Sequence, residues 1–265
     1  EKDYGYDSLT LWDQQDVQSK MQSGRYLGGL FDANSGHIHP LNYTLGLAQA
    51  ALDAGVIIYT DSAVTKVTRK SQANVCQTAQ GQIKAQQVLF CGNAYMGKLV
   101  PEISNKIMPV GTYIGATEPL GEARAKALIN NNMAIADVNF VLDYFRLSAD
   151  YRMLFGGRVS YSTLPPPNLM HSMRQRMLGV FPQLADVKMA YSWGGNVAIT
   201  MNRGPHFGRV GQDLYFAQGF SGHGIAATGL AGKLLAEAVA GQAERFDLFK
   251  EISHLPFPGG TLLKT

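Results

Sequence analysis

Residues 216–241, FAQGFSGHGIAATGLAGKLLAEAVAG, limit the possible folds more than any other stretch of this sequence. They read as the end of a strand, a glycine-rich turn and a helix. Gly222, Gly224 and Ala227 have the G-x-G-x-x-A spacing that lets a backbone approach a dinucleotide pyrophosphate closely. A free-standing nicotinamide-binding fold needs further βαβ units after this helix, and only QAERFDLFKEISHLPFPGGTLLKT follows. The segment therefore indicates either another kind of nucleotide contact or a tight turn whose small residues let the helix pack closely on a sheet.

The first third of the chain predicts a helix followed by short strands. HPLNYTLGLAQAALDAG starts its helix at Pro40, places Leu41, Leu45 and Leu52 on one face and stops at Gly55. VIIYT, AVTKVTRK, ANVCQTA and IKAQQVLFCGNAY follow as β-rich segments. The apolar run from Val88 to Cys91 suits a strand covered on both faces. Its exit turn lies where ligands of open α/β sheets collect.

The middle of the chain predicts an antiparallel sheet. Its segments alternate in polarity and are rich in aromatic residues, and Ala149-Asp150 is a plausible hairpin turn. After the helical NLMHSMRQRMLGVFPQL, the chain returns to the first domain. We therefore expect an α/β fold, α+β overall, in which residues 27–100 and 193–255 form one discontinuous domain and residues 1–26 and 101–192 form the other.

Composition excludes several classes of protein. A net charge of +3 without a Lys/Arg block gives no support for nucleic-acid binding. No apolar run reaches the roughly 20 residues that a membrane span needs. Cys76 and Cys91 form no C-x-x-C pattern, and the first residues resemble no leader peptide, so we expect a cytoplasmic protein. His37 and His39 have no convincing metal-ligand spacing, and we expect no metal site.

An ordered set of motifs resembles the FAD-dependent amine and amino-acid oxidoreductases of the D-amino-acid oxidase, glycine oxidase and sarcosine oxidase superfamily. The motifs cover nearly the whole chain: GGLFDANSGHIHPLNYTLGLAQAALDAG, VLFCGNAYMGKLVPEI, MPVGTYIGATEPL, FRLSADYRMLFGGRVSYS, WGGNVAITMNRGPHFGRV and LYFAQGFSGHGIAATGLAGKLLAEAVAG. The resemblance implies that 27–100 and 193–255 form a partial, Rossmann-like FAD-binding domain. The other domain, with its antiparallel sheet, would then bind the substrate.

The resemblance also answers what the glycine-rich turn does. In that superfamily the turn before the last long helix lies against the flavin ring. Unpaired N–H groups and the positive end of the helix dipole there favour negative charge on the reduced ring. The FAD-binding residues implied are Cys91, Gly92, Asn93, Arg203, Gly222, His223, Gly224 and Ile225. For Arg203, a surface charge is the alternative.

One departure from the superfamily concerns the start of the chain. The G-x-G-x-x-G turn for the ADP half of FAD follows the first strand in these enzymes, and no such segment precedes Lys20. We therefore expect a chain that lacks the N-terminal part of the FAD domain, belongs to a longer gene product and exposes a sheet edge.

The substrate class follows from two positions. Glycine-oxidase-like members carry an arginine that clamps the substrate carboxylate where Val197 stands here, and a second arginine where Gly222 stands. A primary amine without an adjacent carboxylate fits better, and γ-glutamylputrescine is the compound that the resemblance suggests. The implied reaction is oxidation of the amine by FAD, with molecular oxygen as acceptor, to an aldehyde, ammonia and hydrogen peroxide. No catalytic Ser/His/Asp set is expected, because the flavin carries the chemistry.

The residues implied at the substrate are His39, Tyr144, Arg146, Trp193 and His223. Each has a structural alternative: His39 could cap the helix at Pro40, Tyr144 and Arg146 could lie on a solvated sheet face, and Trp193 could be a packing residue. Two other functions stay open, a glycine- or sarcosine-type oxidase and a relative or fragment that binds a ligand without catalysis. The oligomeric state is left open.

Overall fold

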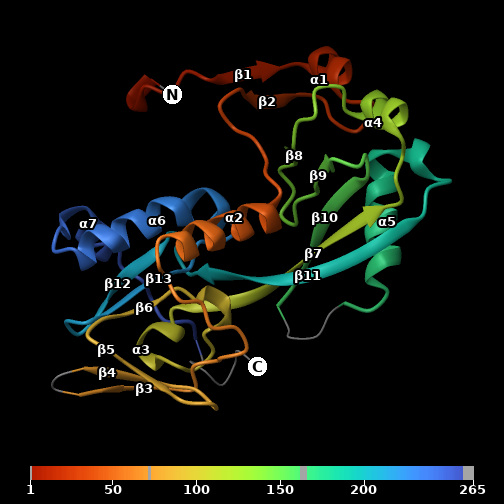
Figure 1. Ribbon diagram of the computed structural model, residues 1–265. Helices are drawn as coiled ribbons and strands as arrows, with labels where there is room; N and C mark the ends of the chain where they lie inside the picture. Colours follow the sequence, from red (N-terminus) through yellow and green to blue (C-terminus); the bar gives the residue numbers. More distant parts are fainter. Residues whose placement is uncertain (1, 71–72, 162–165, 259–265) are drawn as a thin grey trace. The chain divides into compact units, whose positions relative to one another are not determined.

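The computed structural model describes residues 2–70, 73–161 and 166–258, and it divides into two compact units (Figure 1). Unit 1 contains Glu1–His39, Thr112–Ser160 and Leu164–Gly195, and unit 2 contains Pro40–Gly111, Tyr161–Thr163 and Asn196–Thr265. Residues 27–39 fall in unit 1, whereas the sequence prediction grouped them with 40–100. The reason is that β2 (Gly29–Asp32) pairs with β1 (Leu9–Trp12). Which unit binds which molecule remains a prediction.

Unit 1 is built around a five-stranded sheet with the strand order β11-β7-β10-β9-β8. β9 pairs antiparallel with β10 on one side and with β8 on the other, which confirms the predicted antiparallel sheet. The elements with residues in unit 1 are β1, α1 (Gln14–Lys20), β2, β7 (Ile107–Thr117), α4 (Glu122–Leu128), β8 (Ile135–Ala136), β9 (Tyr144–Leu147), β10 (Met153–Ser160), α5 (Leu169–Val180) and β11 (Met189–Thr200).

One face of this sheet forms the core of unit 1. Phe145 and Leu147 alternate along β9 with two half-buried residues, and they pack into a buried cluster with Met173 and Met177 of α5. The hairpin from β9 to β10 turns at Ser148–Arg152, as predicted, and Tyr151 has a positive φ of 60° there. Because the core side of β9 is filled, its polar residues must lie on the opposite face.

Unit 2 contains a three-stranded sheet, β12-β13-β6, and a three-stranded meander, β3-β4-β5. Figure 1 shows α6 and α7 beside β12 and β13, and Leu234 and Leu235 of α6 pack with Phe207 and Tyr215 of these strands. The elements of unit 2 not already given are α2 (Pro40–Asp53), β3 (Lys66–Arg69), β4 (Asn74–Gln77), β5 (Gln82–Ala85), β6 (Val88–Phe90), α3 (Pro101–Ser104), β12 (His206–Val210), β13 (Leu214–Gln218), α6 (Gly224–Val239) and α7 (Glu244–Lys250).

Two sequence expectations about unit 2 are wrong, the strand at 56–60 and the cover on both faces of the strand at 88–91. VIIYT, residues 56–60, forms no strand, and Ile57 is 72% exposed. The helix at 40–53 is confirmed, but Leu41 and Leu45 on its apolar face are 60% and 57% exposed. Leu89 of β6 is 41% exposed, so β6 is not covered on both faces. Apolar pattern alone could not reveal that these surfaces have no cover in this chain.

Candidate functional site

Two turns predicted to contact a cofactor lie side by side in unit 2. β6 and β13 run parallel, with Phe90 opposite Phe216, so their carboxyl ends reach the same edge of the sheet. The Asn93 side chain, in the turn after β6, accepts a hydrogen bond of 2.9 Å from the backbone N–H of Gly219, in the turn after β13. Asn93 holds a left-handed φ of 48°. One side chain therefore joins the 91–93 turn to the glycine-rich turn.

The glycine-rich turn leaves its backbone open. Gly222 has a φ of +97°, and a Cβ built there would meet no atom within 4 Å. α6 begins directly afterwards, and the N–H groups of Gly224, Ile225 and Ala226 have no hydrogen-bond acceptor among the described residues. These groups, together with the helix dipole, make the start of α6 an electropositive surface without a side-chain charge.

Arg203 lies at the same end of the sheet. It occupies the turn between β11 and β12 with a φ of 63°, and its N–H donates to the Thr200 carbonyl. Because His206 of β12 is opposite Gln218 of β13, this turn is near the exit of β13. The Arg203 side chain is exposed, and a contact between it and a cofactor remains a prediction.

Beside this turn lies a buried polar cluster that the sequence analysis did not identify. Gln218 is fully buried, and its amide donates to His206 Nδ1 at 3.0 Å and to the Ile103 carbonyl at 2.8 Å. The His206 ring lies 4.4 Å from the His254 ring, between centroids. Burial, with His254 and the Lys106 ammonium nearby, lowers the pKa of His206 from 6.5 to about 3. His206 is therefore a neutral hydrogen-bond acceptor.

Tyr144 and Arg146 share the non-core face of β9 in unit 1. The Tyr144 ring covers Gly156 of β10, where a Cβ would come within 2.0 Å of it, and its hydroxyl donates to the Tyr113 carbonyl at 3.4 Å. Arg146 Nη1 lies 3.1 Å from His37 Nδ1, and Nη2 donates to the Ile38 carbonyl at 3.2 Å. Burial raises the pKa of Tyr144 and lowers that of Arg146. Both side chains on this face are half-buried.

The structure does not join the other predicted substrate residues to this pair. His39 is exposed, two residues beyond His37. Trp193 of β11 is 46% exposed, and no hydrogen bond or ring contact links it to Tyr144 or Arg146 within the described residues. His223 is an exposed residue in unit 2, just before α6. The roles of these three side chains remain predictions.

Among the described residues, no group of three or more His, Cys, Asp or Glu side chains is placed to hold a metal ion. No helix in this part of the chain combines the length and the apolar character needed to cross a membrane.

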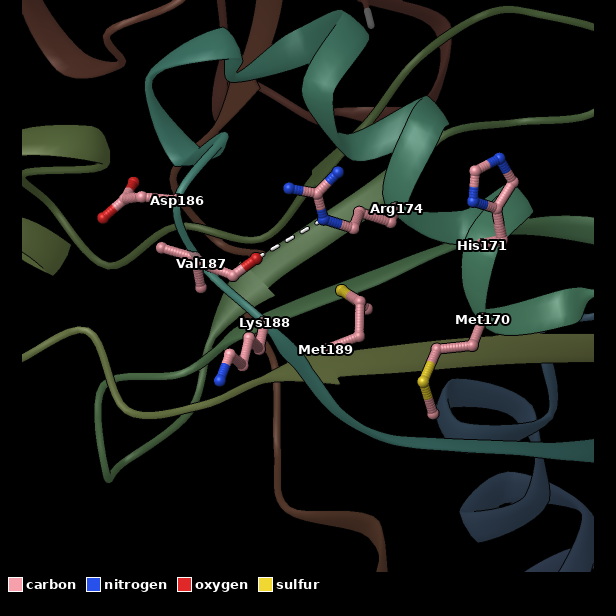
Figure 2. A pocket seen from close by; sticks show the side chains of 7 residues that line it. All are labelled: Met170, His171, Arg174, Asp186, Val187, Lys188 and Met189. Atoms are coloured by element: carbon pink, nitrogen blue, oxygen red, sulfur yellow. Dashed lines mark hydrogen bonds between the residues drawn. The ribbon is translucent and has the colours of Figure 1, made fainter.

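A pocket of about 350 Å³ lies in unit 1, and none of the residues predicted from sequence lines it (Figure 2). Its cations are Arg174 and Lys188, and Arg174 Nε donates to the Val187 carbonyl at 3.4 Å. A second donor of Arg174 is taken by the Ala185 carbonyl. Since backbone carbonyls already occupy this guanidinium, the pocket is a weaker candidate than the two sites above. It is lined by Met170, His171, Arg174, Asp186, Val187, Lys188 and Met189.

The fold is shared with a class of oxidoreductases of known structure. It resembles the crystal structure of glycine oxidase from Geobacillus kaustophilus with a TM-score of 0.83 and 19% identity, covering 96% of this chain and 69% of that one. L-proline dehydrogenase from P. horikoshii gives a TM-score of 0.79 at 18% identity, covering 94% and 70%. At these identities the comparison establishes the fold alone.

The family follows from sequence. Residues 1–238 match the family described as "DAO: FAD dependent oxidoreductase", and the chain belongs to this FAD-dependent family. It is 44% identical over 262 residues to γ-glutamylputrescine oxidoreductase of Escherichia coli K12, and 45% identical over 267 residues to the probable oxidoreductase OrdL of Haemophilus influenzae. These alignments cover 98% and 99% of this chain. The chain spans 61% of the length of each relative.

The residues present fit part of an FAD site. A Cβ built at Gly222 would meet no atom within 4 Å, and the N–H groups at the start of α6 have no acceptor among the described residues. The Asn93 side chain joins the two turns through its hydrogen bond with Gly219. A planar ring that gains negative charge can approach such a surface without meeting a Cβ.

Proposed function

We propose that this chain is part of a flavoenzyme that oxidises a primary amine, with γ-glutamylputrescine as substrate. The overall reaction converts the amine, oxygen and water to an aldehyde, ammonia and hydrogen peroxide, in the cytoplasm. The observation that carries the proposal is the 44% identity to γ-glutamylputrescine oxidoreductase over 98% of this chain.

The chain's own contribution at the cofactor is a shaped, electropositive backbone. Cys91, Gly92, Asn93, Arg203 and residues 222–225 would hold FAD, which when bound supplies the acceptor for the hydride equivalent lost by the amine carbon. The N–H groups at the start of α6 are already oriented, so stabilising negative charge there requires no rearrangement of the protein. The hydrogen bond from the Gly219 N–H to Asn93 keeps the two turns in register.

The proposed substrate is supported by two positions that lack an arginine. Val197 and Gly222 stand at the positions where the resembled glycine oxidases carry arginines, so no carboxylate clamp is expected beside the reacting carbon. The side chains proposed to contact the amine or the rest of the substrate are His39, Tyr144, Arg146, Trp193 and His223.

An anaerobic spectrum of the full-length gene product tests the proposal. We expect a flavin absorption band that is bleached by γ-glutamylputrescine and not by glycine. Only γ-glutamylputrescine has an amine remote from its carboxylate, and such an amine suits a site that has no arginine at positions 197 and 222. Admitting air should restore the band and produce one hydrogen peroxide for each amine consumed.

The other outcomes favour the alternatives. Bleaching by glycine alone would replace the proposal with a glycine- or sarcosine-type oxidase. A protein without flavin would indicate a binding protein that does not catalyse this reaction. Bleaching by the amine without peroxide on admitting air would retain the amine substrate and exclude oxygen as the acceptor.

A further inference from the structure

Arg146 is a half-buried cation whose contacts are all with neutral groups. Its Nη1 group reaches His37 Nδ1 at 3.1 Å and the Leu147 carbonyl at 3.3 Å, and Nη2 donates to the Ile38 carbonyl. No carboxylate lies within salt-bridge distance of it among the described residues. By contrast, Arg25 and Arg176 of the same unit both pair with Asp143. A partly desolvated charge without a counter-ion is costly for the folded protein.

His37 accepts a hydrogen bond from this guanidinium, and its contacts determine which ring nitrogen carries the proton. An arginine only donates hydrogen bonds, so His37 Nδ1 must accept and carry no proton. Its Nε2 lies 2.8 Å from the Asn132 carbonyl, which only accepts, so the ring proton is on Nε2. Both contacts are satisfied by one neutral imidazole, which fixes the guanidinium from one side.

The donors left over form a site for an anion. Of the five N–H groups of Arg146, the Nε–H and one on Nη2 have no acceptor among the described residues. A carboxylate can accept from both at once, the bidentate geometry for which arginine is suited. Tyr144, on the same face of β9, adds an aromatic wall beside this position.

We propose that Arg146 binds the carboxylate of an acidic ω-amine substrate and that His37 is the positioning residue that fixes the Arg146 guanidinium for it. This inference rests on the proposed function, in which the substrate's carboxylate is remote from the oxidised carbon. The Arg146 guanidinium, held by His37, would bind the carboxylate of the substrate. This contact would make the enzyme prefer a γ-glutamylated diamine to the free diamine.

The test uses the full-length holoenzyme and a ligand that cannot react. N-butyl-γ-glutamine keeps the γ-glutamyl carboxylate but lacks the terminal amine, and its α-carboxamide carries a neutral amide in place of that carboxylate. Binding of each is measured by calorimetry. We expect Arg146→Gln to weaken binding of the first about 10- to 100-fold, the range of a charged hydrogen-bonded contact, and to leave binding of the second unchanged. Equal weakening of both ligands would overturn the proposal.

The positioning role is tested with matched histidine variants. Asn places its carbonyl oxygen where Nδ1 of histidine lies, so His37→Asn should keep most of the affinity for N-butyl-γ-glutamine, whereas His37→Leu should lose about tenfold. In turnover with γ-glutamylputrescine, His37→Leu should raise KM and leave kcat within twofold. His171→Asn, an exposed histidine on α5, should behave as wild type. Asn and Leu variants with the same affinity would refute the tautomer argument.

These measurements separate the inference from the function on which it rests. An enzyme that oxidises another amine but binds N-butyl-γ-glutamine through Arg146 would refute the proposed substrate and leave the anion site. An enzyme that oxidises γ-glutamylputrescine, and whose ligand binding does not change on replacing Arg146, would support the proposed substrate and refute the anion site. Thermal unfolding and flavin content of every variant must match wild type, and Arg146→Lys, which keeps the charge without the bidentate geometry, should bind with intermediate affinity.

Discussion

In two histidines of this chain, the hydrogen-bond donors around the ring determine which ring nitrogen is unprotonated. His37 Nδ1 faces an arginine and His206 Nδ1 faces the amide of Gln218, so in both rings Nδ1 must be an acceptor. The sequence shows neither fact. His37 and His39 lie two residues apart in the sequence, and the side-chain contact from Arg146 to His37 depends on residues 109 positions apart coming together.

His206 makes stability depend on pH. Its pKa is about 3 in the folded protein and near 6.5 when unfolded, so below pH 6.5 the unfolded chain binds a proton that the folded chain does not. The stabilisation is complete above about pH 6.5 and is lost as the pH falls toward 3. We expect the free energy of unfolding to fall from pH 7 to pH 5 by at most ~1.4 kcal/mol per pH unit from this group.

Urea unfolding of wild type and His206→Asn at pH 7, 6 and 5 measures this contribution. Asn keeps an acceptor near the Gln218 amide but cannot be protonated, so the variant should show the shallower decline. His171→Asn, which removes an exposed histidine, serves as the control and should follow wild type. Parallel pH curves for wild type and His206→Asn would contradict the assignment.

At the scale of elements, Tyr144 depends on a glycine in the neighbouring strand. A Cβ at Gly156 would lie 2.0 Å from the Tyr144 ring, so Gly156→Ala forces this ring off the face of β10. Overpacking of this kind typically costs about 1–3 kcal/mol, and we expect Tm to fall accordingly. Gly46→Ala, in α2 with open space at its Cβ, is the matched control and should raise Tm.

A double variant identifies the cause. Tyr144→Ala removes the ring that Gly156→Ala displaces, so the two changes together should cost less than the sum of their separate effects. Strict additivity would mean that Gly156 is required for another reason.

Elements were predictable from sequence where local signals were strong, and surfaces were not. Pro40 and Gly55 bound one helix correctly, and the 222–224 glycines placed the start of another. The turn at 91–93 was located from its strand, but the Asn93 contact to Gly219 depends on two strands over a hundred residues apart becoming neighbours. Residues 56–60 have the composition of a strand, but no neighbouring strand pairs with them among the described residues, so they do not form one.

At the scale of the whole molecule, unit 2 carries an extended apolar surface. The exposed side chains come from α2 and the segment after it: Leu41, Tyr43, Leu45, Leu47, Leu52, Val56, Ile57, Ile58 and Tyr59. We call these nine residues the 41–59 patch. Soluble monomers seldom expose contiguous apolar areas beyond a few hundred Å², and larger ones bind other surfaces. The curated relatives with which this chain aligns are longer than it, since the chain spans 61% of their length.

The 265-residue chain should therefore bind the dye ANS and self-associate. Leu45→Lys combined with Ile57→Lys places two charges in the 41–59 patch, and we expect ANS fluorescence to fall severalfold and the sedimentation coefficient to approach that of a monomer. Gln82→Lys combined with Gln87→Lys adds the same charge at exposed polar positions of the same unit, so it separates loss of apolar surface from a general gain of charge. If both double variants reduce ANS binding equally, net charge rather than the 41–59 patch governs association. If neither the wild type nor the variants bind the dye, these nine side chains pack against one another in solution and the exposed surface is smaller than their individual exposures indicate.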